Sequence, residues 1–201
     1  MRNAHFVGLA TLAICAATGA ALAEIRPSLT SVYSEISRTR CPNDFNRPLS
    51  QLGEQPITYS CPGRAGFAVD VTYRGASVQV TFRRSGEKQA HAQLGAGHDV
   101  GDVVEWRGEK GVKGFAPGAA ILRLRTRDNS GKPSDVFGIV RLAEGKACPA
   151  AFIDAAANPN ASELARRTAD EIAAEFPCGE GAPRIVGVET TRAAEALARS
   201  R

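Results

Sequence analysis

Hydrophobic and polar residues alternate along the middle of the chain, from Gln55 to Leu142. In FAVDVTYR, at 67–74, apolar side chains stand at alternate positions, and SVQVTFR at 77–83 repeats the pattern. AILRLRTR, at 120–127, sets two leucines and a threonine opposite three arginines. A period of two predicts antiparallel strands that bury one face and leave the other in water.

Three more segments have the residues of strands. DVVEWRG at 102–108 places Val104 and Trp106 on one predicted face and Arg107 on the other, which is expected to meet water. VFGIVRL at 136–142 and RIVGV at 184–188 are rich in branched residues. Clusters of Gly, Pro, Asn and Asp separate these segments, as between the strands of a meander. The sequence therefore predicts an α+β fold, mainly antiparallel β, whose meander closes into a barrel or curved sheet.

One segment has a helical pattern, between Asn160 and Pro177. Its apolar and small residues recur at spacings of three and four: Leu164, Ala165, Thr168, Ala169, Ile172, Ala173 and Phe176. Asn160 followed by Glu163 three positions later predicts a capping box, and Pro177 ends the pattern. On the other face Arg166 and Asp170 are spaced for an i,i+4 ion pair. We predict one C-terminal amphipathic helix.

The first residues have the pattern of a secretory signal peptide at 1–23. Arg2 is followed by an uncharged, apolar stretch at 6–21, and Ala21-Leu22-Ala23 matches an A-x-A cleavage site. We expect export to the periplasm or the medium, and a single domain at 24–201 that ends in a short basic tail. No later segment approaches the roughly 20 apolar residues of a membrane-spanning helix.

Composition adds little to this picture. Loss of the signal peptide removes one arginine and no acid, which changes the net charge from +4 to +3. So small a charge is typical of an ordinary surface, and it does not favour nucleic acid.

Four cysteines remain once Cys15 is removed: Cys41, Cys61, Cys148 and Cys178. An even number in an oxidising compartment predicts two disulfides. The pairing Cys41–Cys61 with Cys148–Cys178 closes the shortest loops, although the sequence leaves the connectivity open. Redox couples are usually C-x-x-C pairs, and a metal site needs more ligands nearby, so we interpret Cys148–Cys178 as a structural bridge.

Candidate chemistry is otherwise sparse. His98, Asp99 and Asp102 lie in a glycine-rich stretch between two strand patterns, without the ligand spacing of a zinc site. The chain lacks a G-x-S-x-G motif, and four paired cysteines leave no reactive thiol. We therefore predict no catalytic residue, no metal and no cofactor.

Arg123, Arg125 and Arg127 form the most defensible binding feature. Three guanidinium groups on one strand face are suited to bidentate contacts with carboxylates or phosphates. The alternative is a solvent-exposed face on which the arginines pair with acids of neighbouring strands. Aromatic stacking residues are missing near this row, which argues against nucleic acid and leaves an anionic polysaccharide as a possible ligand.

The chain resembles a family of uncharacterised exported proteobacterial proteins in four motifs: YSCPG (59–63), VEWRG (104–108), ACPAAFIDAAANPNASELARRTADE (147–171) and FPCG (176–179). The order of elements and four cysteines match, and the resemblance covers roughly residues 55–188. It implies a shared fold and an exported protein. The family has no assigned activity, so the resemblance transfers no catalytic residue.

A weaker likeness is to periplasmic inhibitors of C-type lysozyme, which are small antiparallel barrels with a Y-x-C motif and a later Trp-containing strand. Tyr59-Ser60-Cys61 and Trp106-Arg107-Gly108 stand in comparable order. The Ser-Gly…Tyr loop that those inhibitors insert into the enzyme's cleft is missing here.

These patterns together favour an exported, non-enzymatic protein that acts by binding or in envelope maintenance, with an anionic polysaccharide or a lytic enzyme as its partner. The first alternative is an inhibitor of a cell-wall lytic enzyme. The second is a hydrolase whose acidic residues converge only in space.

Overall fold

The computed structural model describes residues 29–41, 55–84, 92–127, 130–143 and 146–200. The expected signal peptide at 1–23 lies outside these ranges. Within them the chain forms ten strands and two helices: β1 (Thr30–Glu35), β2 (Ile57–Pro62), β3 (Phe67–Arg74), β4 (Ser77–Arg84), β5 (Ala92–Ala96), β6 (Asp99–Gly111), β7 (Gly114–Arg127), β8 (Pro133–Ala143), β9 (Lys146–Asp154), α2 (Ala161–Glu175), β10 (Arg184–Ile185) and α3 (Thr191–Ala198).

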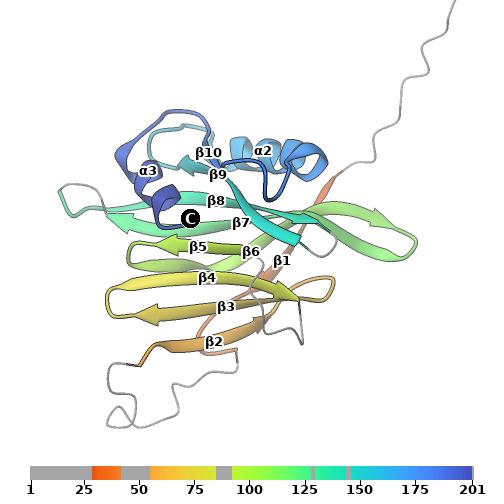
Figure 1. Cartoon of the computed structure of the whole chain (residues 1–201), viewed down its shortest axis with the longest axis horizontal. Coiled ribbons are helices and arrows are strands. Elements are labelled where there is room, and N and C mark those ends of the chain that lie inside the picture. Colours follow the sequence, from red (N-terminus) through yellow and green to blue (C-terminus); the bar gives the residue numbers. More distant parts are fainter. Residues whose placement is uncertain (1–28, 42–54, 85–91, 128–129, 144–145, 201) are drawn as a thin grey trace, which may run out of the picture.

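The strands belong to two sheets (Figure 1). β2, β3, β4 and β5 form an antiparallel meander in sequence order. The larger sheet has the order β1-β6-β7-β8-β9-β10, antiparallel except for the short parallel pair of β9 and β10. The predicted strands at 67–74, 77–83 and 120–127 are confirmed, and RIVGV contributes only Arg184–Ile185 as a strand.

The two sheets share one hydrophobic core. It takes Val69 and Val71 from β3, and Trp106, Leu122 and Leu124 from the larger sheet, all of them fully buried. These are the alternate positions that the period of two assigned to the buried side. Burial of such side chains is worth about 1.5–3 kcal/mol each, which makes this core the main source of stability.

The meander was predicted to close into a barrel or a curved sheet, and of these two the closed barrel is wrong for the strands that the structure describes. β6 pairs with β1 on one side and β7 on the other, so β5 has no free partner there and remains paired with β4 alone. β1, which the sequence analysis did not predict, therefore keeps the two sheets separate. The result is an open pair of sheets around a common core.

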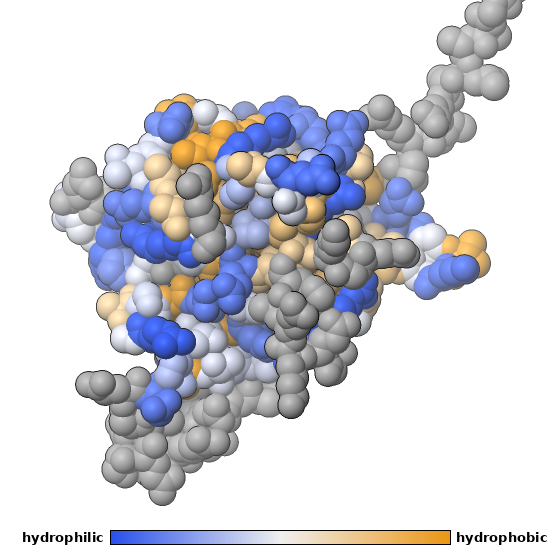
Figure 2. Space-filling view, in the orientation of Figure 1, coloured by the Kyte–Doolittle hydropathy of each residue, from blue (hydrophilic) through white to orange (hydrophobic). Residues whose placement is uncertain are grey.

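The β6–β7 hairpin extends beyond the rest of the larger sheet (Figure 1). Its turn consists of Val112 and Lys113, and the side chain of Val112 is fully exposed. The pairing shifts register at Gly108, where an added Cβ would overlap the carbonyl oxygen of Ala116. Figure 2 shows hydrophobic atoms beside hydrophilic ones at this tip.

Helix α2 packs on the other face of the larger sheet and forms a second core with it. Ala165, Ala169 and Ile172 are buried there against residues such as Ile139 and Ile153. The alanine-rich face allows a close approach, because a Cβ on Gly118 of β7 would lie 2.8 Å from the Ala173 methyl group. The predicted amphipathic helix is confirmed, and its apolar face is the one that packs on the sheet.

The end of α2 is held by a side chain from the sheet. Arg141 of β8 donates hydrogen bonds from Nη1 to the carbonyl oxygens of Ile172 and Ala173. Carbonyls of the last helical turn have no partner within the helix, so this arginine satisfies two of them.

The expected basic tail contains a second helix, α3. Thr190 caps it, since its side chain accepts a hydrogen bond from the Ala193 amide, and Ala193 and Ala196 are fully buried. The buried carboxylate of Asp154, at the end of β9, accepts hydrogen bonds from Thr190 Oγ1 and Arg192 Nε. Residues 190–198, including α3, therefore belong to the folded structure.

Both disulfides have the predicted connectivity. Cys41, which follows β1, joins Cys61 of β2 with a Cα–Cα distance of 4.9 Å. Cys148 of β9 joins Cys178, just after α2, with a Cα–Cα distance of 5.7 Å. The first bridge links the two sheets, and the second ties the end of the helix to the sheet.

Candidate functional site

The predicted arginine row lies on β7, on the face opposite the main core. Arg123 Nη1 is 3.3 Å from Asp135 Oδ2 on β8. Arg125 lies 3.8 Å from Asp99 and 3.5 Å from Asp102, both on β6. Acids of the neighbouring strands therefore accompany two of the arginines, as the alternative interpretation expected.

Arg127 differs from the other two. Its Nη1 donates a hydrogen bond of 2.9 Å to the carbonyl oxygen of Gly131, in the turn before β8. The ion pairs of Arg123 and Arg125 involve side chains that are 49% and 47% exposed, and such pairs are worth about 0–1 kcal/mol. Breaking either ion pair would therefore cost little, and a binding role for the row stays a prediction.

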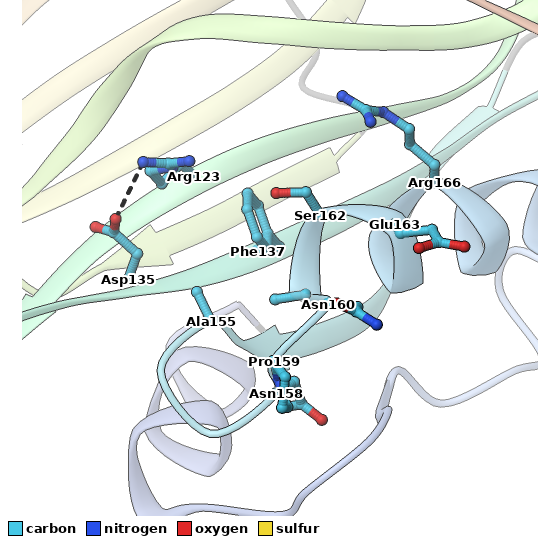
Figure 3. A pocket seen from close by; sticks show the side chains of 11 residues that line it. Arg123, Asp135, Phe137, Ala155, Asn158, Pro159, Asn160, Ser162, Glu163 and Arg166 are labelled. Carbon is cyan, nitrogen blue, oxygen red and sulfur yellow. Dashed lines mark ion pairs between the residues drawn. The ribbon is translucent and has the colours of Figure 1, made fainter.

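A depression of about 460 Å³ lies between Arg123 and the first turn of α2. Figure 3 shows the Phe137 ring between Arg123 and Ser162, with Arg166 extending from the helix above them. The Arg123 guanidinium lies 5.4 Å from the centre of the Phe137 ring, within the range of a cation–π contact. β7, β8 and α2 thus place two arginines around an aromatic floor.

The first turn of α2 opens into this depression. Asn160 occupies the N-cap position, but its side chain makes no capping hydrogen bond, so the predicted capping box is wrong. Ala161, Ser162 and Glu163 line the depression. Backbone amides at a helix start carry partial positive charge, and this end of α2 adds to the field of the arginines.

A second depression, of about 330 Å³, continues from the first. The two share Arg123 and Phe137, and the second adds Tyr33, Val103 and Arg125. We call the two together the groove. It lies on the part of the larger sheet beside α2, and its walls combine three arginines with the acids Asp102, Glu105, Asp135 and Glu163.

Arg166 is positioned by a sheet residue. Its Nε donates to Glu105 Oε1 at 2.6 Å and its Nη2 to Oε2 at 3.3 Å. The hydrogen bond to Glu105 is the main reason that the pKa of Arg166 is raised, and the hydroxyl of Tyr33 adds a smaller contribution. Arg166 therefore pairs across to β6, and the predicted ion pair with Asp170 does not form.

Asp170 pairs with a buried arginine that the sequence analysis placed on a solvated face. Arg107, 9% exposed, donates to both carboxylate oxygens of Asp170 at 2.8 and 2.6 Å, and to Ser31 Oγ at 2.8 Å. These contacts join α2 to β6 and β1. They connect residues 63 positions apart, so no local sequence signal could have indicated them.

Other titratable groups serve the fold. Tyr73 donates a hydrogen bond of 2.6 Å to Asp99. Burial, followed by this hydrogen bond, raises the pKa of Tyr73 well above its usual range, so the phenol stays protonated.

No group of three His, Cys, Asp or Glu side chains suited to a metal occurs in the part of the chain that the structure describes, where His98 is exposed.

Comparison with known proteins gave no relatives: no family model, curated protein or solved structure matches the chain. Neither helix in the described ranges is long and apolar enough to cross a membrane.

Proposed function

We propose that the protein is an exported, non-enzymatic binding protein whose groove takes a carboxylate-bearing polysaccharide. Export is supported by the two disulfides, which persist in oxidising compartments. The open shape of the groove suits a chain-like ligand that enters from the side and extends past both ends.

The observation that carries this proposal is the pair of arginines around Phe137. Arg123 comes from β7 and Arg166 from α2, and both side chains are almost half exposed at the groove. A carboxylate over Phe137 would meet guanidinium groups from two directions, together with the start of α2. Charge-assisted hydrogen bonds of this kind are about twice as strong as neutral ones.

The acids and amides of the groove fit the rest of such a ligand. Asp135, Glu163 and the exposed amide of Asn160 supply acceptors and donors around the first depression. Sugar hydroxyls can donate hydrogen bonds to carboxylates and accept them from amides. A polyhydroxylated ligand can therefore bind the carboxylates of the groove, which would repel a simple anion. A uronic-acid polysaccharide combines both properties.

The test compares two arginines of the same strand. Alginate, a uronic-acid polysaccharide, serves as the probe, with neutral dextran as the control ligand, and binding is measured by calorimetry at low and high salt. We expect Arg123→Ser to weaken alginate binding about tenfold, the loss of roughly one charge-assisted contact. Arg127→Ser, which removes the same charge outside the groove, should change it less than about twofold.

Two results would refute the proposal. The first is wild-type protein that does not bind alginate in preference to dextran. The second is equal weakening by Arg123→Ser and Arg127→Ser, because this would reflect general attraction between charges instead of a site.

The β6–β7 hairpin favours a second candidate function, inhibition of a cell-wall lytic enzyme. Val112 is fully exposed at the tip, and a narrow hairpin is a shape that can enter a substrate cleft. If so, the protein should inhibit lysozyme on cell-wall substrate, and Val112→Ser should reduce the inhibition while Val188→Ser does not. Unchanged lysozyme activity at micromolar excess of protein would end this candidate.

A further inference from the structure

Exposed apolar side chains are concentrated at one end of the groove. Across the described ranges four large hydrophobic residues are exposed: Tyr33, Val103, Val112 and Val188. Tyr33 and Val103, 47% and 46% exposed, both line the second depression. An exposed aromatic ring beside an aliphatic side chain and charged groups is typical of a surface that binds a ligand.

The backbone holds Tyr33 at this position. β1 is an edge strand, and Tyr33 is paired in register with Glu105 of β6. On its outer side the Tyr33 carbonyl oxygen accepts a hydrogen bond from Arg64 Nε at 3.2 Å. The ring is therefore presented at the groove by a fixed strand.

Each depression is large enough for a ligand group of its own. Their volumes, about 460 and 330 Å³, fall within the usual range of about 300–1,000 Å³ for small-ligand pockets. Arg123 and Phe137 line both, so a ligand can continue from one to the other without leaving the groove. Arg125 also lines the second depression and offers a second guanidinium.

We propose that the Tyr33 end of the groove is a second sugar subsite, so that the groove binds at least two consecutive residues of an acidic polysaccharide. This inference rests on the proposed function. One uronate residue lies over Phe137 with its carboxylate at Arg123. The next places the apolar face of its ring on Tyr33 and its carboxylate near Arg125, while Asp102 and Glu105 accept hydrogen bonds from hydroxyls.

The experiment measures affinity as a function of ligand length. Monomeric, dimeric and trimeric uronates are titrated into wild-type protein, Tyr33→Ala, Tyr33→Phe and the control Val112→Ala. We expect the wild type to bind the dimer about tenfold more tightly than the monomer. Tyr33→Ala should lose most of this gain, whereas Tyr33→Phe and Val112→Ala should retain it.

The outcomes separate the two proposals. Equal affinity of wild-type protein for monomer and dimer overturns the second subsite alone. Failure to bind any uronate overturns the proposed function and the subsite with it. If Tyr33→Phe no longer binds the dimer more tightly than the monomer, then the gain depends on the hydroxyl of Tyr33 and not on stacking. If Tyr33→Ala does not fold, Val103→Ser on the neighbouring strand β6 must reduce the same gain, and an unchanged gain refutes the subsite.

Discussion

Replacement of Asp154 by alanine should destabilise the protein severely, because this carboxylate is fully buried where β9 meets α3. It accepts hydrogen bonds from the amides of Ala156 and Ala157, at 2.9 and 3.1 Å. It also accepts them from Thr190 Oγ1 at 2.6 Å and from Arg192 Nε at 2.8 Å. Alanine would leave all four donors without this partner.

The size of the effect follows from these contacts. Hydrogen bonds to a charged group contribute about 1.5–3 kcal/mol, and removal of one partner of a buried ion pair costs about 3–5 kcal/mol. The four contacts act on one group and are not additive, so we expect Asp154→Ala to lower the free energy of unfolding by about 3–5 kcal/mol. Urea denaturation followed by circular dichroism measures this difference.

A control comes from the same helix. Glu195 and Arg199 form an ion pair of 2.8 Å whose side chains are well exposed, so Glu195→Ala should cost at most about 1 kcal/mol. If Asp154→Ala also costs less than about 1 kcal/mol, then the buried carboxylate does not hold α3 in place, and the reasoning is wrong.

The same group makes stability depend on pH. Burial alone would raise the pKa of Asp154, but hydrogen bonds from Thr190, Arg192 and the Ala157 amide, with the charge of Arg192, lower it below 3.8. Its contribution is therefore present above the unfolded pKa near 3.8 and is lost as the pH falls through the lower, folded pKa. Asp154→Asn should lack this part of the acid sensitivity.

Two further predictions concern the attachment of α2. Gly118→Ala should lower the free energy of unfolding by about 1–3 kcal/mol, because its Cβ would lie 2.8 Å from the Ala173 methyl group. Gly111→Ala is the control, since a Cβ there has no other atom within 4 Å, and urea titration should show no change in stability. Removal of the Cys148–Cys178 bridge should cost about 3.7 kcal/mol from the chain entropy of a loop with separation 30, and a cost under about 1 kcal/mol in a double Cys→Ala variant would contradict this.

The strands and the packing face of α2 could be predicted because they depend on local periodicity. Buried apolar residues occur at every second position of a half-buried strand, as with Val69 and Val71 in β3 and Leu122 and Leu124 in β7. The choice between a barrel and two sheets has no such signal. It depends on whether β5 or β1 pairs with β6, and the pairing of strands is a non-local property.

The groove was beyond sequence reasoning for a related reason. Arg123 was singled out on β7, but Tyr33, Phe137 and Arg166 come from three other elements that only the folded chain brings together. Arg107 was predicted to face water, because hydrophobic and polar residues alternate along its strand. In the structure α2 covers that face, and Arg107 is buried. A period of two identifies the two faces of a strand, and it does not reveal whether a helix covers the second.

The Cys148–Cys178 bridge also has a mechanical consequence. All of α2, including Arg166, lies within the covalent loop that it closes, whose ends are 30 positions apart in the chain. At about 3.3–3.6 Å per residue, the loop contains roughly 100 Å of chain. A force applied at the chain ends cannot extend this part while the disulfide is intact. A single-molecule pulling experiment should therefore record a longer unfolded chain after reduction, and one wall of the groove would be the segment released.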